Sequence, residues 1–257
     1  MAGCNYYAIS ALPTLPDLGA PPPISPADLR EHVKAHASLR RLVDVLLVSD
    51  DLLQREALLA GEIEEIEPAV LTREQVLGEE ALPAELAPEE EPARRIPSDA
   101  VWARYFRHAA RVARDFGGRL LAGWVAYEVS LRNALVTARA KALGLEPADY
   151  RVASELGGSD EDFSAVVQEW AAAPNPLKGQ QGLDRARWAW LVDHEAWFSF
   201  SDDEVGAYAA KLLLLVRWHR LTQEADGDPS PTPPSRRDAA PAQHPAEGRS
   251  PAERAAR

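Results

Sequence analysis

Residues 207–218 read AYAAKLLLLVRW, a stretch in which Lys211 is the only charge before Arg217. Apolar side chains therefore cover most of the circumference of a helix built from these residues, and such a helix is buried on nearly all sides. The preceding Ser201-Asp202-Asp203-Glu204 has the spacing of a capping box. The sequence predicts a central helix that begins there and runs to about Leu221.

Two further helices are predicted upstream of this segment. One runs over roughly residues 119–143 and ends at Gly144, and its apolar side recurs at alternating three- and four-residue steps. The other begins after Ser98, a good N-cap, and runs from residue 99 to about 115, where Gly117-Gly118 interrupts it. The apolar stripe of the 119–143 helix consists of Leu121, Trp124, Leu131 and Leu135, with Glu128 among them.

The N-terminal part also favours helices. Ser25, Pro26 and Asp28 predict a helix start, and the helix continues on an imperfect apolar stripe through Leu46. A second helix is expected from about Asp50 to Gly61, and Thr72-Arg73-Glu74-Gln75 has capping-box spacing for a short third one. At most NYYAIS, residues 5–10, is expected to form a short strand. No stretch shows sustained two-residue alternation, so the predicted fold class is all-α.

Composition predicts three regions. Residues 1–97 contain a proline-rich start, two or three helices and an acidic loop, and residues 98–225 form the main helical core, which contains all seven tryptophans. Residues 226–257 are rich in proline and lack large apolar side chains, so this tail is expected to be disordered.

Charge and cysteine content exclude several classes. The net charge of −12 argues against a general binder of nucleic acid, which is normally basic. A single cysteine, Cys4, cannot form an internal disulfide or a cysteine-based zinc site, and it favours a reduced, cytoplasmic setting. No signal peptide and no apolar run of about 20 residues is present, so a soluble protein is expected.

Most of the negative charge lies in one segment. Residues 62–91 hold eleven glutamates and one arginine, a net −10 of the −12. A solvated loop or helix face is the commoner explanation of such a run, and docking on a basic partner surface is the sharper hypothesis. The glutamates named for this docking segment are Glu62, Glu64, Glu65, Glu67, Glu89, Glu90 and Glu91.

Signals for catalysis, metals and cofactors are weak. NPLKGQQG at residues 175–182 lacks the spacing of a phosphate-binding loop and is expected to connect two helices. His32 and His36 are four residues apart but lack the HExxH pattern, and His194-Glu195 has no accompanying nucleophile. We therefore expect no catalytic residue, no metal and no cofactor.

A charged pattern on the two longest predicted helices is more informative. Glu128 lies within an apolar stripe, with Arg132 one turn later and Asn133 next to it. Lys211 and Arg217 interrupt and close the apolar run of the last helix. A charge on a buried face needs a partner. We expect Glu128 or Arg132 to form a buried polar network with Lys211 or Arg217 that fixes helix register.

Three separated segments resemble a poorly characterised bacterial family encoded in the operons of V-type (A/V-type) ATP synthases. They are NYYAISALPTLPDLGAPPPIS (5–25), GWVAYEVSLRNALVTARAKALGL (123–145) and DHEAWFSFSDDEVGAYAAKLLLLVRW (193–218). The Trp, Glu and Leu-Arg-Asn of the middle segment also resemble the helical C (or d) subunit of that machine. The aromatic residues that carry the family pattern are Tyr6, Tyr7, Trp124, Tyr208 and Trp218.

The resemblance implies a non-catalytic helical accessory or connector protein. Its expected partners are V-type ATP synthase subunits, and a C-subunit-like role would couple the stalk to the membrane ring. The position would then be peripheral at the inner membrane, through a membrane-embedded partner and without insertion. Two alternatives stay open: a small helical enzyme that uses Glu128, Arg132 and His194, and a helical scaffold unrelated to the ATPase.

Overall fold

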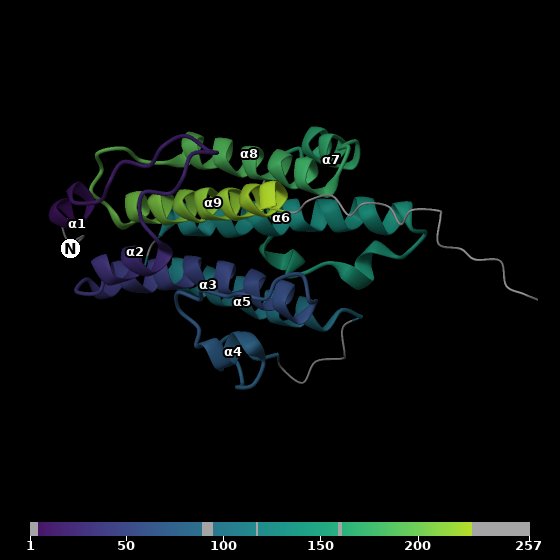
Figure 1. Cartoon of the computed structure of the whole chain (residues 1–257), viewed down its shortest axis with the longest axis horizontal. Helices are drawn as coiled ribbons and strands as arrows, with labels where there is room; N and C mark the ends of the chain where they lie inside the picture. Colours follow the sequence, from purple (N-terminus) through teal and green to yellow (C-terminus); the bar gives the residue numbers. More distant parts are fainter. Residues whose placement is uncertain (1–4, 89–94, 117, 159–160, 228–257) are drawn as a thin grey trace, which may run out of the picture.

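The computed structural model describes residues 5–88, 95–116, 118–158 and 161–227, and this part of the chain is helical and holds no β-strand, as predicted (Figure 1). The longest helices are α3, α5, α6, α8 and α9. The elements in chain order are α1 (Tyr6–Ser10), α2 (Pro26–His32), α3 (Ala37–Leu59), α4 (Arg73–Leu77), α5 (Pro97–Phe116), α6 (Arg119–Ala142), the 3-10 turns Pro147–Tyr150 and Ser154–Leu156, α7 (Ser164–Ala171), α8 (Pro176–His194) and α9 (Asp202–Gly227).

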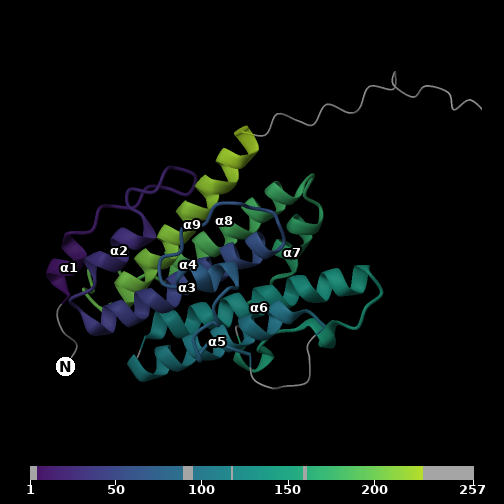
Figure 2. The ribbon, with the colours of Figure 1, turned by 60° about the horizontal axis from the view of Figure 1, so that its bottom comes forward.

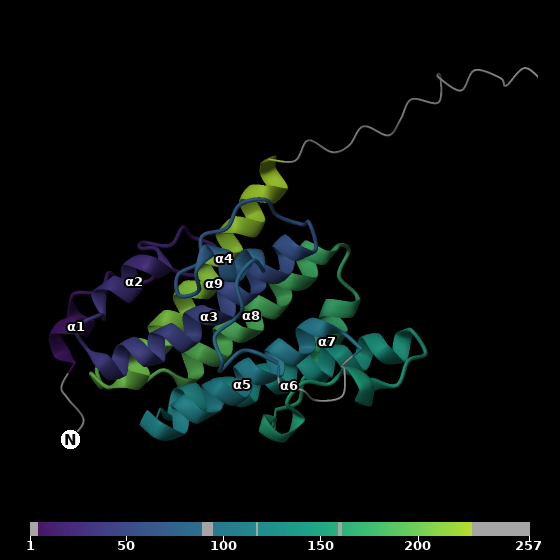
Figure 3. The ribbon, with the colours of Figure 1, turned by 90° about the horizontal axis from the view of Figure 1, so that it is seen from below.

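Helix α9 is the central helix that its apolar sequence predicts. It packs against α3, α8, α6 and α2, and Leu212 and Leu215 are fully buried. Gly206 allows this close packing, because a Cβ atom there would lie 3.1 Å from Leu120 and 3.3 Å from Leu42. Figure 2 and Figure 3 show the last turns of α9 extending past the neighbouring helices.

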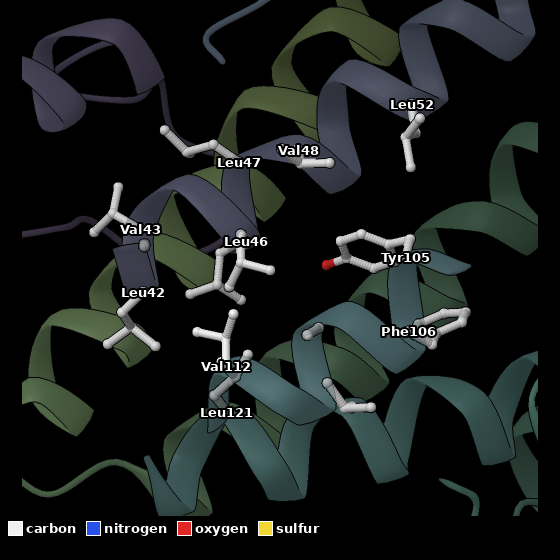
Figure 4. Packing of buried hydrophobic residues seen from close by; sticks show 14 of the residues in the cluster. Leu42, Val43, Leu46, Leu47, Val48, Leu52, Tyr105, Phe106, Val112 and Leu121 are labelled. Atoms are coloured by element: carbon white, nitrogen blue, oxygen red, sulfur yellow. The ribbon is translucent and has the colours of Figure 1, made fainter. Parts of the chain in front are cut away.

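Two groups of buried apolar side chains form the core. The larger group joins α3, α5 and α9, with Leu46, Tyr105 and Val112 near its middle (Figure 4). The smaller group joins α6, α8 and α9 around Leu131 and Leu191. Trp124 of α6 packs against both groups. The helices of residues 1–97 thus share a core with those of residues 98–225.

The first predicted helix is divided differently from the expectation. It breaks after His32 into α2 and α3, and α3 then continues through Asp50, where a boundary was expected. The break lets Arg30 of α2 reach Asp44 of α3 at 2.7 Å. The polar residues at the expected boundary stay helical because Asp50 pairs with Arg220 at 2.8 Å. Tertiary partners here outweigh local propensity.

Two other expectations were wrong. Residues 6–10 form the helical turn of α1 and not a strand. Residues 175–182 are the start of α8 and not a connecting loop: the Asn175 side chain accepts a hydrogen bond from the backbone N–H of Lys178 at 2.8 Å, and Pro176 occupies the first turn. Gly179 suggested a loop, but it is a close-approach position, because a Cβ there would lie 3.1 Å from Trp170 of α7.

Several predicted helix ends were right. Thr72 forms the reciprocal capping box that its spacing predicts, and Ser25, predicted as an N-cap, also forms one with Asp28. Helix α6 ends at Ala142, and Gly144 follows with a positive φ of 68°. Helix α9 begins where expected, but without the predicted capping box. The Glu204 carboxylate accepts hydrogen bonds from the backbone N–H groups of Phe198 and Phe200, and not from that of Ser201.

Candidate functional site

A chain of ion pairs links α6, α8 and α9 inside the bundle. The Glu128 carboxylate accepts two hydrogen bonds from the Arg187 guanidinium, at 2.7 and 3.1 Å. Arg187 also reaches Asp184 at 3.2 Å, and Asp184 pairs with Arg217 at 2.6 Å. The structure thus brings Glu128 and Arg217 into one network, but through Arg187 and Asp184, which sequence reasoning missed.

Asp184 is the centre of this network. Its side chain is 0% exposed, and its Oδ1 atom accepts hydrogen bonds from Gln180, Arg187 and Arg217. Burial alone would lower the pKa of Arg187, but the carboxylates of Glu128 and Asp184 raise it above its ordinary value. The network holds two positive and two negative charges, so its charges balance, and it links three helices. Asp184 Oδ2 and Arg217 Nε have no hydrogen-bond partner among the described residues.

The other residues predicted for the network have separate partners. Arg132 pairs with Asp99 at 3.1 Å, and its guanidinium lies 5.0 Å from the ring centre of Trp102. Asn133 holds the chain after α6, because its side chain bonds both the N–H and the C=O of Val152 at 2.9 Å. These contacts join α6 to α5 and to the segment around Val152.

Lys211 forms a second buried ion pair at one end of the bundle. Its ammonium group donates to the Glu195 carboxylate, and both side chains are less than a tenth exposed. The same ammonium lies 5.2 Å from the ring centre of Trp188 and 5.3 Å from that of Trp197. This arrangement compensates a buried lysine with one carboxylate and two aromatic faces.

The Lys211 pair forms part of a hollow that we call the aromatic groove, with a volume of about 570 Å³. Tyr208 belongs to its lining and donates its hydroxyl to the C=O of Pro13 at 2.9 Å, and burial raises the pKa of Tyr208 to about 12. Trp197 is 64% exposed and Phe198 81% exposed. The groove is lined by the aromatic residues Tyr6, Trp188, Trp197, Phe198, Phe200 and Tyr208, by apolar residues of the segment 9–16 and of α8 and α9, and by Asp17, Glu195, Glu204 and Lys211.

The loop between α8 and α9 is built to present these rings. Phe198 and Phe200 have positive φ angles of 57° and 51°, which bulky residues rarely adopt. Glu204 stabilises this backbone by accepting from the N–H of Phe200 at 2.8 Å and of Phe198 at 3.3 Å. Asn5 ties the N-terminal segment to the start of α9, because its side chain donates to the Asp202 carboxylate at 2.6 Å. Backbone strain held in this way is typical of a functional loop.

A second and larger hollow, which we call the leucine groove, has a volume of about 1410 Å³. It lies among α3, α5, α6, α7 and α8, and Arg132 and Arg139 belong to its lining. Four of its apolar lining residues are large and exposed: Leu59, Ile96, Leu143 and Leu145. The leucine groove reaches the N-terminal half of α8 at Gln180 and Leu183, whereas the aromatic groove reaches its C-terminal half at Trp188 and Val192.

The five family-motif aromatics have different positions. Tyr6 lines the aromatic groove, and the 84%-exposed Tyr7 contacts it edge-on at 5.5 Å between ring centres. Trp124 stacks on Tyr127 at 5.7 Å within the core. Trp218 packs against the N-terminal segment, with its indole Nε1 3.5 Å from a Cβ built on Gly19. Tyr6 and Tyr208 therefore line the aromatic groove, and Tyr7 contacts it through Tyr6.

The acidic segment is attached through its backbone and exposes its carboxylates. Asp51 of α3 accepts hydrogen bonds at 2.8 Å from the N–H groups of residues 69–71, although burial raises its own pKa. Gln54 bonds the N–H of Glu67 at 2.7 Å, and Ile66 is buried. Glu62, Glu64, Glu65 and Glu67 are all exposed, and Glu89, Glu90 and Glu91 lie outside the described residues.

The residues considered for chemistry do not converge. His194 stacks on Trp190 at 4.0 Å between ring centres and hydrogen-bonds its C=O, whereas Glu128 pairs with Arg187 and Arg132 pairs with Asp99. His32 hydrogen-bonds the C=O of Ala8 at 2.7 Å. In residues 5–88, 95–116, 118–158 and 161–227, no group of three His, Cys, Asp or Glu side chains suits a metal ion. Cys4 lies outside those residues.

No helix in the described part of the chain is both long and apolar enough to cross a membrane. No family model, curated protein or solved structure matches the chain.

Proposed function

We propose that this protein is a non-catalytic helical connector that docks one partner at the aromatic groove and another at the leucine groove. The carrying observation is the distribution of exposed apolar side chains. Of the ten large ones among the described residues, four line each groove, and Tyr7 contacts the aromatic one through Tyr6. Apolar side chains gathered in this way mark interaction sites, whereas single exposed ones need no explanation.

The rigidity between the two grooves supports the same proposal. Both grooves reach α8, at opposite halves, and α8 carries Asp184 and Arg187 of the ion-pair network that fixes it to α6 and α9. A protein that transmits position or force between two partners needs such a fixed spacing. The enzyme alternative needs Glu128, Arg132 and His194 to converge on one cavity, and their separate contacts do not favour it.

The resemblance to the operon-associated family suggests V-type ATP synthase subunits as the partners. In that setting the protein would be an accessory subunit or a C-subunit-like coupling element between stalk and membrane ring, at the cytoplasmic face. The exposed, backbone-anchored glutamates of the acidic segment would add a docking surface for a basic partner, since exposed charges of one sign speed and orient association.

Affinity capture of the tagged full chain from its own cells tests this function. Wild type should recover V-type subunits identified by mass spectrometry. Trp197→Ser with Phe198→Ser should lose one subset, and Leu143→Ser with Leu145→Ser another. Phe116→Ser is the matched control, because Phe116 is exposed outside both grooves.

The outcomes distinguish the ATPase connector from a scaffold unrelated to the ATPase. Failure of the wild-type chain to recover any V-type subunit, under conditions that keep the complex intact, would overturn the ATPase connection. Recovery of a different assembly would leave a scaffold unrelated to the ATPase. Replacing Glu62, Glu64, Glu65 and Glu67 by Gln should weaken capture most at low salt, and capture unchanged at low salt would remove the acidic segment from the docking surface.

A further inference from the structure

The charge and shape of the aromatic groove suit a guanidinium group. Its lining contains three carboxylates, Asp17, Glu195 and Glu204, against the single ammonium of Lys211, a net charge of −2. Lys211 contacts Trp188 and Trp197, yet Trp197 keeps 64% of its surface exposed. An exposed indole next to carboxylates can stack an arginine and pair its charge at the same time.

Elsewhere the same chain uses arginine–aromatic stacking repeatedly. Arg41 lies 5.5 Å from the ring centre of Phe116, and Arg139 lies 5.8 Å from that of Trp170. Arg132 over Trp102 is a third case, and there Asp99 supplies the paired carboxylate. The exposed Trp197 and Phe198 line the same groove as the carboxylates of Asp17 and Glu204, and no arginine of the described residues lies over either ring.

The part of the chain beyond Gly227 carries a matching pair of charges. Residues 228–237 read DPSPTPPSRR, with four prolines followed by Arg236 and Arg237. Arg236 and Arg237 are the only two adjacent basic residues in 228–257, and Asp228 and Asp238 lie on either side of them, so it is the arginine pair, and not the whole stretch, whose charge is opposite to the net −2 of the groove lining. A proline-rich stretch favours the extended polyproline II helix, which rises about 3.1 Å per residue.

The length of this stretch fits the distance that it has to cover. Lys211 and Gly227 are sixteen residues apart on α9, or about 24 Å at the α-helical rise of about 1.5 Å per residue. If Asp228 makes the reversal of the chain, residues 229–235 span about 22 Å along α9 as polyproline II, which is within one residue's rise of that distance. It would deliver Arg236 and Arg237 to the level of Lys211, at the aromatic groove.

We propose that Arg236 and Arg237 dock in the aromatic groove of their own chain, on Trp197 and Phe198, with residues 228–235 as the spacer. The tail then covers the surface that the proposed function assigns to one partner, and the partner has to displace it. Only this competition rests on the proposed function. The docking itself is a property of the isolated chain.

Fluorine NMR of the purified full chain, labelled with 5-fluorotryptophan, tests the docking. The chain has seven tryptophans, and Trp197→Phe assigns the Trp197 resonance. Arg236→Glu with Arg237→Glu should shift that resonance and leave the resonances of Trp102 and Trp170 in place. Arg249→Glu with Arg254→Glu makes the same charge change further along the tail and should leave the Trp197 resonance unchanged.

Two further measurements check the geometry. Deletion of residues 231–234 shortens the spacer and should shift the Trp197 resonance as the double arginine variant does. High salt should shift the Trp197 resonance of wild type in the same way, because salt screens the charge pairs.

A Trp197 resonance identical in wild type and in the Arg236/Arg237 variant overturns the proposal. A shift that depends on protein concentration also overturns it, since the tail would then come from a second copy. Neither result bears on capture of V-type subunits, so the two proposals fail separately.

Discussion

Asp184 is the residue on which the ion-pair network depends. It is fully buried and bonds both Arg187 and Arg217. Asp184→Asn keeps the shape but leaves those two guanidinium groups short of negative charge inside the bundle, so we expect the free energy of unfolding to fall by about 3 kcal/mol. Urea denaturation measures this change. Asp193→Asn, at an exposed position of the same helix, is the control, and an equal midpoint for Asp184→Asn and wild type would show that the network contributes no stability.

His108 gives the stability a dependence on pH. Burial, and then the nearby Arg111, lower its pKa from the ordinary value of 6.5. The unfolded chain therefore binds a proton more readily than the folded one, and stability should fall as pH drops through 6.5 toward the folded pKa. His108→Gln should reduce that loss, as measured by thermal unfolding between pH 7.5 and pH 5.5. His36→Gln, at an exposed histidine, is the control, and an equal pH dependence in wild type and His108→Gln would refute the assignment.

The charged residues of the ion-pair network could be predicted from the sequence only where they interrupt or end an apolar run. Glu128 and Arg217 stand out because each interrupts or ends an apolar run. Asp184 and Arg187 do not stand out, because they follow a stretch with two glycines that resembles a loop. That stretch starts a helix capped by Asn175, and its glycines are positions of close approach to α7, which only the tertiary contacts show.

At the scale of elements, the two glycines of α8 differ in what they tolerate. A Cβ on Gly182 would meet the far end of the flexible Glu169 side chain at 3.1 Å, whereas one on Gly179 would meet the Trp170 ring at 3.1 Å and Ala173 at 3.5 Å. Alanine is favoured over glycine in a helix by about 1 kcal/mol. We expect Gly182→Ala to raise the free energy of unfolding by up to about 1 kcal/mol. Gly179→Ala should leave the free energy of unfolding unchanged or lower it, because the new Cβ would press on the Trp170 ring. Equal unfolding midpoints for the two variants would contradict the close α7–α8 contact.

Elements were predictable where their ends carry capping signals, and their packing was not. Ser25, Thr72 and Gly144 mark helix ends locally, and the structure agrees. The expected boundary near Asp50 failed, because Asp50 and Asp51 are satisfied by Arg220 and by the backbone of residues 69–71. Polar residues that look like a helix end can instead be partners of a distant segment.

At the scale of the whole molecule, the two grooves could not be predicted, since each is assembled from segments far apart in the chain. The aromatic groove combines residues 6–17 with residues 188–211, and the leucine groove combines parts of α3, α5, α6 and α8. The all-α class followed from helical periodicity. The change in composition at residue 97 does not separate two packing units, because α3, which precedes it, packs against α5 and α9, which follow it.

This shared packing predicts that the described body unfolds as one cooperative unit. Leu46 lies in the larger buried group and Leu191 in the smaller one, and Trp124 and α9 join the two groups. Leu46→Ala and Leu191→Ala should each lower the free energy of unfolding by about 2–5 kcal/mol. In both variants, circular dichroism and tryptophan fluorescence should report one coincident transition. Two separated transitions in either variant, with only one of them moved by the substitution, would mean that residues 1–97 and 98–225 are stabilised independently. The exposed Leu143→Ala serves as the control for a leucine outside the core, and should leave the midpoint within about 0.5 kcal/mol of wild type.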